Sequence, residues 1–436
     1  MSQLISTIDQ GIPGRATPEE IFRINAARET ALSRLLMLYI ASGLFFMLLP
    51  GTFLGVWNLL AISSHRAAEY VSAAWVQAHG HAQIFGWIGT FILGVGFYSI
   101  PKMRHANFGL WVEFATWSLW TAGVALRWLA NVYLWHWRIL LPLSAVLELA
   151  AFLIFFRTVS GHRPQDSSNG KLDEWIFVVI AGTAGLLLAL ALNLGTAVRL
   201  ALNGASPTIG AAFDQTLLVL QAWGFLVPFV WGFSAKWLPV FLGLRPVRGR
   251  VLWLAVALNS LGVLGSFLHW AKLAALLLLL GVGVAIDALN LLRSPLRPAK
   301  IKGVHGTFPT FVRLAYLWGL VAATLGVWAA AVGNAQGIAG ASRHALTVGF
   351  LAMMVFTIGQ RVLPAFAGSL LFSTKLMFAS LALLTAGCLL RVSAEILAYQ
   401  GFLHSAWSWL PISAVTEMMA VTVFAINLTF SFARKF

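Results

Sequence analysis

The sequence predicts an all-α polytopic membrane protein whose twelve transmembrane helices form three pseudo-symmetric four-helix units. Of its 436 residues, 59% are hydrophobic and only 10% are charged, which is more apolar surface than a soluble domain can bury. A glycine–proline pattern also recurs three times along the chain. A single cysteine, Cys388, excludes a disulfide framework, an iron–sulfur cluster and a structural zinc site.

The predicted elements follow a polar, charged segment, residues 1–33, which we expect to be cytoplasmic. Twelve apolar stretches come after it, each about 20 residues long, the length that crosses a hydrocarbon core of about 30 Å. Residues 34–436 therefore form a membrane domain without a separate soluble part, in units of about 34–160, 172–293 and 311–432. The twelve predicted spans are 35–60, 75–100, 109–131, 137–157, 175–199, 213–240, 251–269, 272–292, 312–333, 343–366, 375–398 and 405–430.

The net charge of +15 reports topology rather than a nucleic-acid partner. With a cytoplasmic N-terminus, only seven of the 29 Lys and Arg residues fall in the odd-numbered loops. The positive-inside rule then predicts that both termini are cytoplasmic, with the lipid bilayer as the main partner. The seven residues are Arg66, Arg127, Arg138, Arg199, Lys272, Arg343 and Arg391.

The internal repeat lies in spans 2, 6 and 10. Three stretches of equal length share a glycine at offset 5 and a proline at offset 20, and the first and third begin with His81 and His344, whereas the second has Val219. Two similar segments, "LPLSAVLE" (141–148) and "LPISAVTE" (410–417), lie at the start of spans 4 and 12. Such self-similarity is the signature of repeated units. The three stretches are "HAQIFGWIGTFILGVGFYSIP", "VLQAWGFLVPFVWGFSAKWLP" and "HALTVGFLAMMVFTIGQRVLP".

His81 and His344 are the candidate haem ligands. An offset of 20 residues is about 30 Å of helix, so with the prolines at the inner boundary both histidines lie near the outer one. Two imidazoles at matching depth can supply the axial nitrogens of a haem iron. The alternative is that each histidine is an interfacial residue bonded to a backbone carbonyl.

His79 stands apart from this pair, because residues two apart on a helix point about 200° away from each other. We therefore expect His79 and His81 not to face the same slot, so that His79 is a ligand only for a different metal or if the helix is locally irregular at its mouth. With His136 and His404, which precede the paired LP motifs on the outer side, His79 forms a candidate copper site. The alternative is three interfacial histidines facing water.

The intramembrane charges have two interpretations each. Arg127 and Arg391 end spans 3 and 11 on the outer side, where they are placed either to pair with haem propionates or to snorkel to the interface. Glu148, Glu417 and Asp287 fall at related depths near mid-membrane. Carboxylates there need partners, so they form either a proton path or structural hydrogen bonds between helices.

At the histidine motifs of spans 2 and 10, the sequence resembles the NnrS family of bacterial membrane proteins. The family's His-x-His-x-x-x-Phe-Gly pattern is seen as His79, His81, Phe85 and Gly86, and its His-Ala-Leu-Thr-Val-Gly pattern starts at His344. The acidic residue expected after the second histidine is Ala82 here. The resemblance implies a bacterial inner-membrane protein that carries haem, of b type, and copper and is linked to the nitric oxide response.

More distantly, the chain looks like subunit I of the haem–copper oxidases. There, histidines on spans 2 and 10 hold a low-spin haem on the outer side. The high-spin haem ligand of the oxidases is Ser342 here, span 6 lacks their copper-ligand motif, and span 7 has only His269. The resemblance therefore implies one haem site and no reduction of oxygen to water.

Three functions remain open at this point. The first is that the chain is a haem protein that binds or responds to nitric oxide, with or without copper. Alternatively, it is an electron-transfer subunit that passes electrons between quinol and a periplasmic redox partner, or a transporter or assembly factor without a cofactor. The sequence contains no Cys-x-x-Cys-His motif, dinucleotide fingerprint or P-loop.

Overall fold

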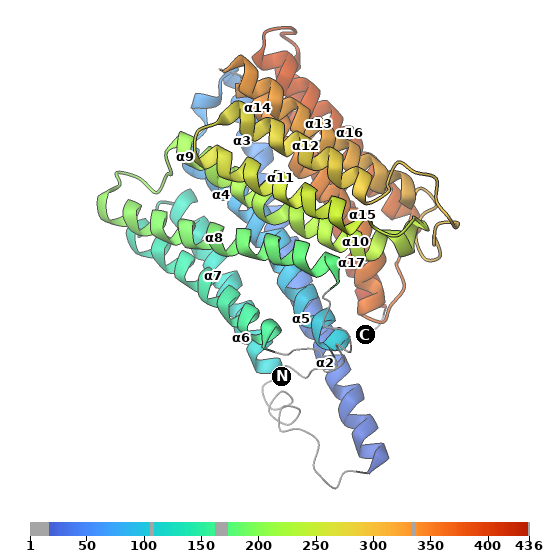
Figure 1. Ribbon diagram of the computed structural model, residues 1–436. Helices are drawn as coiled ribbons and strands as arrows, with labels where there is room; N and C mark the ends of the chain where they lie inside the picture. The colour runs from blue at the N-terminus through green and yellow to red at the C-terminus, as the bar shows by residue number, and fades with distance from the viewer. Residues whose placement is uncertain (1–16, 105–108, 162–172, 334–335, 435–436) are drawn as a thin grey trace.

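The protein is an all-helical bundle (Figure 1). The computed structural model describes residues 17–104, 109–161, 173–333 and 336–434. Eleven helices in this part of the chain are long and apolar enough to cross a membrane. A twelfth, α6 (Leu110–Val132), lies where the sequence predicts span 3, and its Trp, Ser and Thr residues interrupt the aliphatic run. The predicted fold class is confirmed.

Four of the predicted spans contain a π-helical segment, whereas the other eight are each a single α-helix. The single helices are α6, α7 (Trp137–Ser160), α8 (Glu174–Asn203), α11 (Gly249–Phe267), α12 (Ala271–Ala288), α13 (Phe308–Val332), α16 (Thr374–Tyr399) and α17 (Ala406–Ala433). The composite spans are α2–η1–α3 (Pro18–Phe46, Met47–Phe53, Leu54–His65), α4–η3–α5 (Ala73–His81, Ala82–Gly89, Thr90–Arg104), α9–η4–α10 (Ala211–Val219, Leu220–Leu226, Val227–Leu242) and α14–η5–α15 (Gln336–His344, Ala345–Ala352, Met353–Phe366).

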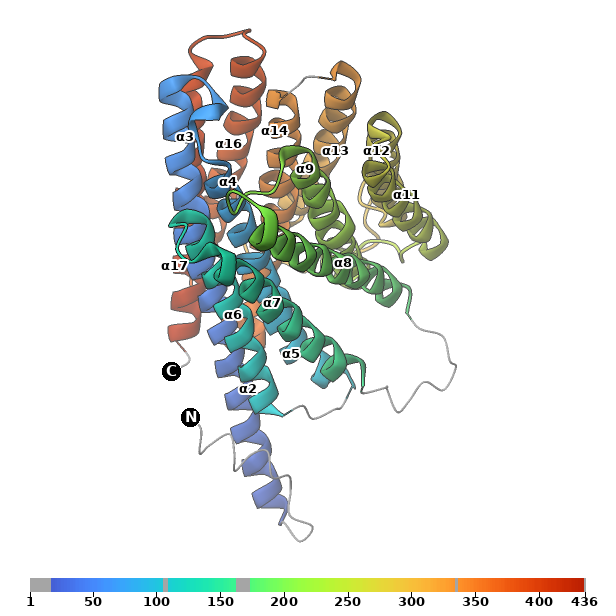
Figure 2. The same cartoon turned by 90° about the vertical axis from the view of Figure 1, so that its left-hand side faces the viewer.

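The first helix starts well before the predicted membrane domain. Thr17 caps α2: its hydroxyl accepts a hydrogen bond from the Glu20 backbone N–H, and the Glu20 carboxylate accepts one from the Thr17 N–H at 2.7 Å. Pro18 occupies the first turn, where its missing N–H is harmless. The predicted segment 1–33 is therefore helical from Pro18 onward, and α2 projects beyond the bundle (Figure 2). Residues 1–16 lie outside the described part.

The π-helical segments follow the internal repeat. In spans 2, 6 and 10, the π-helix begins directly after His81, Val219 and His344, the three residues at offset zero. The fourth, η1, contains Pro50, which cannot donate a helical hydrogen bond. π-Helical turns inside α-helices are rare and are frequently found at functional sites. The three repeat copies thus share a backbone irregularity as well as a sequence pattern.

The glycine at offset 5 explains how the first two helices of each unit pack. A Cβ atom at Gly86 would lie 2.9 Å from the Phe46 side chain, and one at Gly349 would lie 2.5 Å from Trp318. In the second unit, a Cβ atom at Gly185 would overlap the Gly224 carbonyl. A larger side chain at these glycines would meet the facing helix, so the first two helices of each unit pack closely at this level.

The remaining contacts complete a ring. In each unit the last two helices pack as a pair: α6 with α7, α11 with α12, and α16 with α17. Each unit then contacts the next one: α7 packs on α8, α12 on α13, and α17 on α3, so that the first and last spans lie side by side (Figure 2). This pattern confirms the three-unit architecture.

The crossing at Gly185 yields a prediction about stability. We expect Gly185→Ala to destabilise the protein by about 1–3 kcal/mol, because overpacking forces the two backbones apart. Gly195→Ala on the same helix is the control. A Cβ atom there meets nothing within 4 Å, so this change should be neutral or stabilise the helix by up to ~1 kcal/mol. Thermal unfolding in detergent measures both, and equal melting temperatures would contradict the prediction.

Candidate functional site

One cavity of about 270 Å³ collects polar side chains from all three units. Its volume is near the lower end of ligand pockets in proteins, which span roughly 300–1,000 Å³. Apolar residues such as Trp87 and Leu351 form much of its wall. The charged and histidine side chains that line it are His79, His81, Arg127, Asp214, Arg343, His344, Arg391 and Glu417. The structure therefore brings both predicted haem ligands and both predicted propionate partners to the same cavity.

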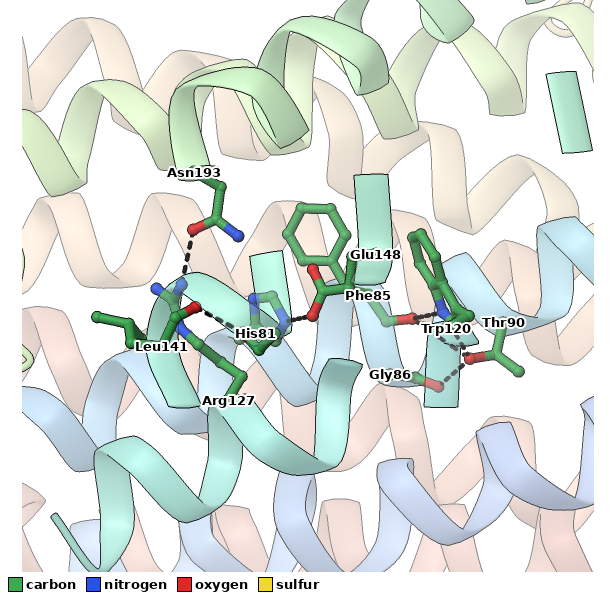
Figure 3. Close-up of polar contacts among 10 residues, drawn as sticks. His81, Phe85, Gly86, Thr90, Trp120, Arg127, Leu141, Glu148 and Asn193 are labelled. Carbon is green, nitrogen blue, oxygen red and sulfur yellow. Dashed lines mark hydrogen bonds and ion pairs between the residues drawn. The ribbon is translucent and has the colours of Figure 1, made fainter. Parts of the chain in front are cut away.

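His81 is held by a carboxylate from span 4. It is the last residue of α4, and its Nε2 lies 2.8 Å from Glu148 Oε1 on α7 (Figure 3). The His81 and Glu148 side chains are only 6% and 0% exposed. This hydrogen bond joins spans 2 and 4 of the first unit, and it supports the structural interpretation of Glu148.

The π-helical segment after His81 is stabilised by side chains that take up its displaced carbonyls. Trp120 Nε1 on α6 donates to the Phe85 carbonyl at 3.1 Å, and the Thr90 hydroxyl donates to the Gly86 carbonyl at 2.6 Å (Figure 3). Buried carbonyls need such partners. Both partners are fully buried, so the irregular backbone beside His81 is fixed by packing.

His344 is held by a different carboxylate. Its Nδ1 lies 3.0 Å from both the Gly340 carbonyl and Glu395 Oε2. Glu395 lies on α16, one turn after Arg391, and is 6% exposed. The His344 side chain is 26% exposed, and this open surface adjoins the cavity. One ring nitrogen is therefore anchored and the other is left for a ligand.

His79 also lines the cavity, which corrects the expectation that His79 and His81 cannot share a slot. The His79 Nδ1 lies 2.8 Å from the Gly51 carbonyl in η1, whereas His81 turns toward α7. Both rings reach the cavity because it extends from span 1, where Gly55 lines it, to span 3, where Arg127 does. The angular argument holds for the helix but not for a cavity of this width.

Arg127 and Arg391 are buried, each with 4% exposure. Arg127 Nη1 donates to Asn193 Oδ1 on α8 at 2.7 Å, and its Nε has no partner in the described chain. Arg391 has no partner there for Nε or Nη1. Buried guanidinium groups do not stay unsatisfied without cost. Donors with no acceptor at the wall of a cavity indicate an anionic or otherwise hydrogen-bonding occupant.

Glu417 matches Glu148 in position but not in partner. A Cβ atom at Gly123 would lie 2.7 Å from Glu148 Cγ, and one at Gly387 would lie 2.7 Å from Glu417 Cγ. Because His344 is bonded to Glu395, Glu417 keeps its Oε1 without a partner among the described residues and faces the cavity. The first and third units thus place their glutamates on equivalent backbone positions, but the two carboxylates have different partners.

Asp287 does not belong with these acids, which corrects the sequence interpretation. It lies at the end of α12 with its side chain 53% exposed, and it forms ion pairs with Arg248 and with Arg293, the latter at 3.4 Å. The predicted span 272–292 is too long at this end, because α12 stops at Ala288. Asp287 therefore lies at the end of the helix, away from mid-membrane.

The predicted copper residues do not come together. His136 and His404 are exposed residues that precede α7 and α17, whereas His79 is half-buried in the cavity. Within the described ranges, no group of three or more His, Cys, Asp or Glu side chains could hold a metal ion. The sequence predicts only that these histidines lie at a similar depth on the same side of the membrane. It does not predict which helices bring them together around the bundle.

Three site residues were not found from the sequence. Glu395 follows Arg391 by four residues, so that both lie on the same helix face, and this spacing was a usable signal. Asn193 and Asp214 come from the second unit, which has no histidine at offset zero. Nothing in the sequence repeat connects them to the histidines.

The residues around the cavity fit a haem group. Metal-bound histidines usually give their second ring nitrogen to a carboxylate or backbone carbonyl, and each cavity histidine does so. The unpartnered N–H groups of Arg127 and Arg391 suit carboxylates such as propionates. The histidines of α4 and α14 would hold the iron, and the two arginines would hold the propionates.

Comparisons with known proteins give a fold and no family. No family model and no curated protein matches the sequence. Among solved structures, the fold is similar to that of a haem–copper terminal oxidase determined as a dimer by cryo-EM. The TM-score is 0.55 at 12% identity, and the match covers 92% of this chain and 84% of that one. The helical bundle is therefore similar in fold to that oxidase, and the likeness shows the fold alone.

The buried pair of His81 and Glu148 yields a second prediction. His81→Ala and Glu148→Ala should each cost about 1–3 kcal/mol, because each leaves a buried polar partner without its hydrogen bond. The double variant should cost clearly less than the sum of the two. Thermal unfolding in detergent measures this coupling. The exposed pair of Arg23 and Glu19 is the control, with an expected coupling of at most about 0.5 kcal/mol. Simple additivity at His81 and Glu148 would contradict the prediction.

Proposed function

We propose that the chain is a haem-binding bacterial inner-membrane protein, with both termini cytoplasmic and a bis-histidine low-spin haem b near the periplasmic side. The observation that carries the proposal is a shared cavity in which histidines from α4 and α14 meet two buried arginines with unpartnered N–H groups. His81 and His344 are the pair predicted from the repeat. The likeness to a haem–copper terminal oxidase supports the same class.

The side chains have distinct tasks in this proposal. A bound haem, held by the histidines, would supply one-electron redox chemistry. Glu395 and the Gly340 carbonyl orient the His344 ring, and Glu148 orients His81. Arg127 and Arg391, each 4% exposed, would hold the propionate carboxylates through guanidinium–carboxylate hydrogen bonds, which are strong in a buried site.

Reduction of oxygen to water is not part of the proposed function. In the resemblance to the oxidases, Ser342 stands where their second haem ligand is expected. Its hydroxyl donates to the Ala322 carbonyl on α13 at 2.8 Å. This serine thus connects two helices. A role in the response to nitric oxide follows from the NnrS resemblance, and copper, if bound, would be the second group that the resemblance implies.

The main alternative is an electron-transfer subunit in which the same haem passes electrons between quinol and a periplasmic redox protein. Two histidine ligands would leave no open position for a gas, and this favours electron transfer. A cofactor-free transporter or assembly factor is the second alternative. The unpartnered arginine donors at the cavity argue against an empty bundle.

The haem prediction is tested by the pigment of the purified protein. The wild type should show a bis-histidine cytochrome b spectrum, and His344→Ala should lose it, because one axial nitrogen is removed. His404→Ala, on the exposed outer surface, is the control and should keep the spectrum. A colourless wild-type protein from haem-replete cells would refute the proposed function.

Nitric oxide separates the two haem functions. If the protein senses or binds this gas, adding it to the reduced protein should displace a histidine and convert the low-spin spectrum to that of an iron–nitrosyl species. An unchanged spectrum would favour electron transfer, since both axial positions then stay occupied. The measurement is an optical and EPR titration, with an added quinol as the reductant in a parallel sample.

A further inference from the structure

The two histidines at the end of α4 differ in which ring nitrogen they leave free. His79 and His81 both line the cavity, and only one of them can complete an axial pair with His344. The repeat favours His81, because it matches His344 in sequence. Their hydrogen bonds provide an independent criterion.

His79 and His344 are held in the same tautomer. The Gly51 carbonyl can only accept a hydrogen bond, so His79 Nδ1 carries the proton and donates it at 2.8 Å. His344 Nδ1 likewise donates to the Gly340 carbonyl and to Glu395. In a neutral imidazole the other nitrogen, Nε2, then keeps its lone pair. An Nδ1–H bonded to a backbone carbonyl or carboxylate, with Nε2 free, is the usual state of a metal-bound histidine.

His81 is held in the opposite way. Its Nε2, the ring nitrogen farther from the backbone, is bonded to Glu148 Oε1 at 2.8 Å. The side chain is 6% exposed, against 26% for His344, and its ring packs against Phe85 with centroids 4.7 Å apart. For Nε2 of His81 to reach an iron, the buried hydrogen bond to Glu148 would have to break.

The space around His79 is shaped for its ring. Gly55 on α3 faces it, and a Cβ atom there would lie 2.8 Å from His79 Cε1. The His79 side chain is half-buried, so that part of the ring stays open to the cavity. Gly55 on one side and the Gly51 carbonyl on another fix the ring plane, and Nε2 has no hydrogen-bond partner among the described residues.

We propose that His79, together with His344, supplies the axial pair, and that His81 is a positioning residue that ties α4 to Glu148. This inference rests on the proposed haem function and changes one of its two ligands. The His81–Glu148 bond holds the end of α4 at the start of the π-helical segment, and His79 one half-turn earlier presents its free nitrogen. The sequence symmetry between His81 and His344 then reflects backbone equivalence, not shared ligation.

The test uses matched glutamine variants of the full-length protein, purified from haem-replete cells. Glutamine in place of His81 can still hydrogen-bond Glu148, and in place of His79 it can still donate to Gly51, so both retain the fold while removing an imidazole. We expect His79→Gln to lose the low-spin optical and EPR signals and His81→Gln to keep them. Loss in His81→Gln alone, loss in both variants or loss in neither would overturn the assignment.

Chemical rescue provides a second readout that a purely structural role would not move. His79→Gly leaves a hole beside Gly55 that free imidazole can fill, so added imidazole should restore the low-spin spectrum. The same addition to His81→Gly should change nothing, because that variant keeps His79 and His344, the two proposed ligands, and has lost only the partner of Glu148. Rescue of His81→Gly, or failure to rescue His79→Gly, would overturn the inference. A wild-type protein without haem would instead overturn the proposed function and remove the basis of this assignment.

Discussion

The close crossing of the first two helices in each unit is the constraint on which the site depends. A glycine at that crossing lets the backbones approach, and the π-helical segment in spans 2, 6 and 10 lies at the same level. A π-helical turn carries an additional residue relative to the α-helical register, so side chains before and after it point in directions that a regular helix would not allow. The histidines stand at the edge of this segment. Their orientation is therefore set by backbone packing before any ligand is considered.

The first and third units have equivalent backbones but differ in the hydrogen-bond partners of their buried charges. Gly123 and Gly387 seat Glu148 and Glu417 in the same way, yet one carboxylate binds a histidine and the other does not. Charges buried in a membrane bundle are costly unless they are paired. The unpaired groups of Arg127, Arg391 and Glu417 face one cavity. The pairs Arg127–Asn193 and His344–Glu395 hold the side chains in its walls.

Much of this arrangement could be predicted from the sequence. Hydropathy located the spans, and the offset of histidine, glycine and proline located the three units, because both depend on residue type and spacing alone. The convergence of His81, His344, Arg127 and Arg391 on one cavity also followed from depth and repeat position. The directions in which side chains point could not be predicted, because tertiary contacts set them. Examples are the π-helical turns, the pairing of Glu148 with His81, and the approach of Asn193 from another unit. Asp287 was misplaced since the end of α12 is set by loop contacts with Arg248 and Arg293.

The closure of the ring by α17 against α3 has a consequence for biogenesis. The cavity wall includes Ala414, Glu417 and Val421 from the final helix as well as Thr52 and Gly55 from the first. During membrane insertion, the cavity therefore lacks one wall until α17 has packed against α3. In the proposed function the haem site would therefore be complete only after α17 has been translated, and termination before residue 406 would leave the cavity without the wall that Ala414, Glu417 and Val421 supply.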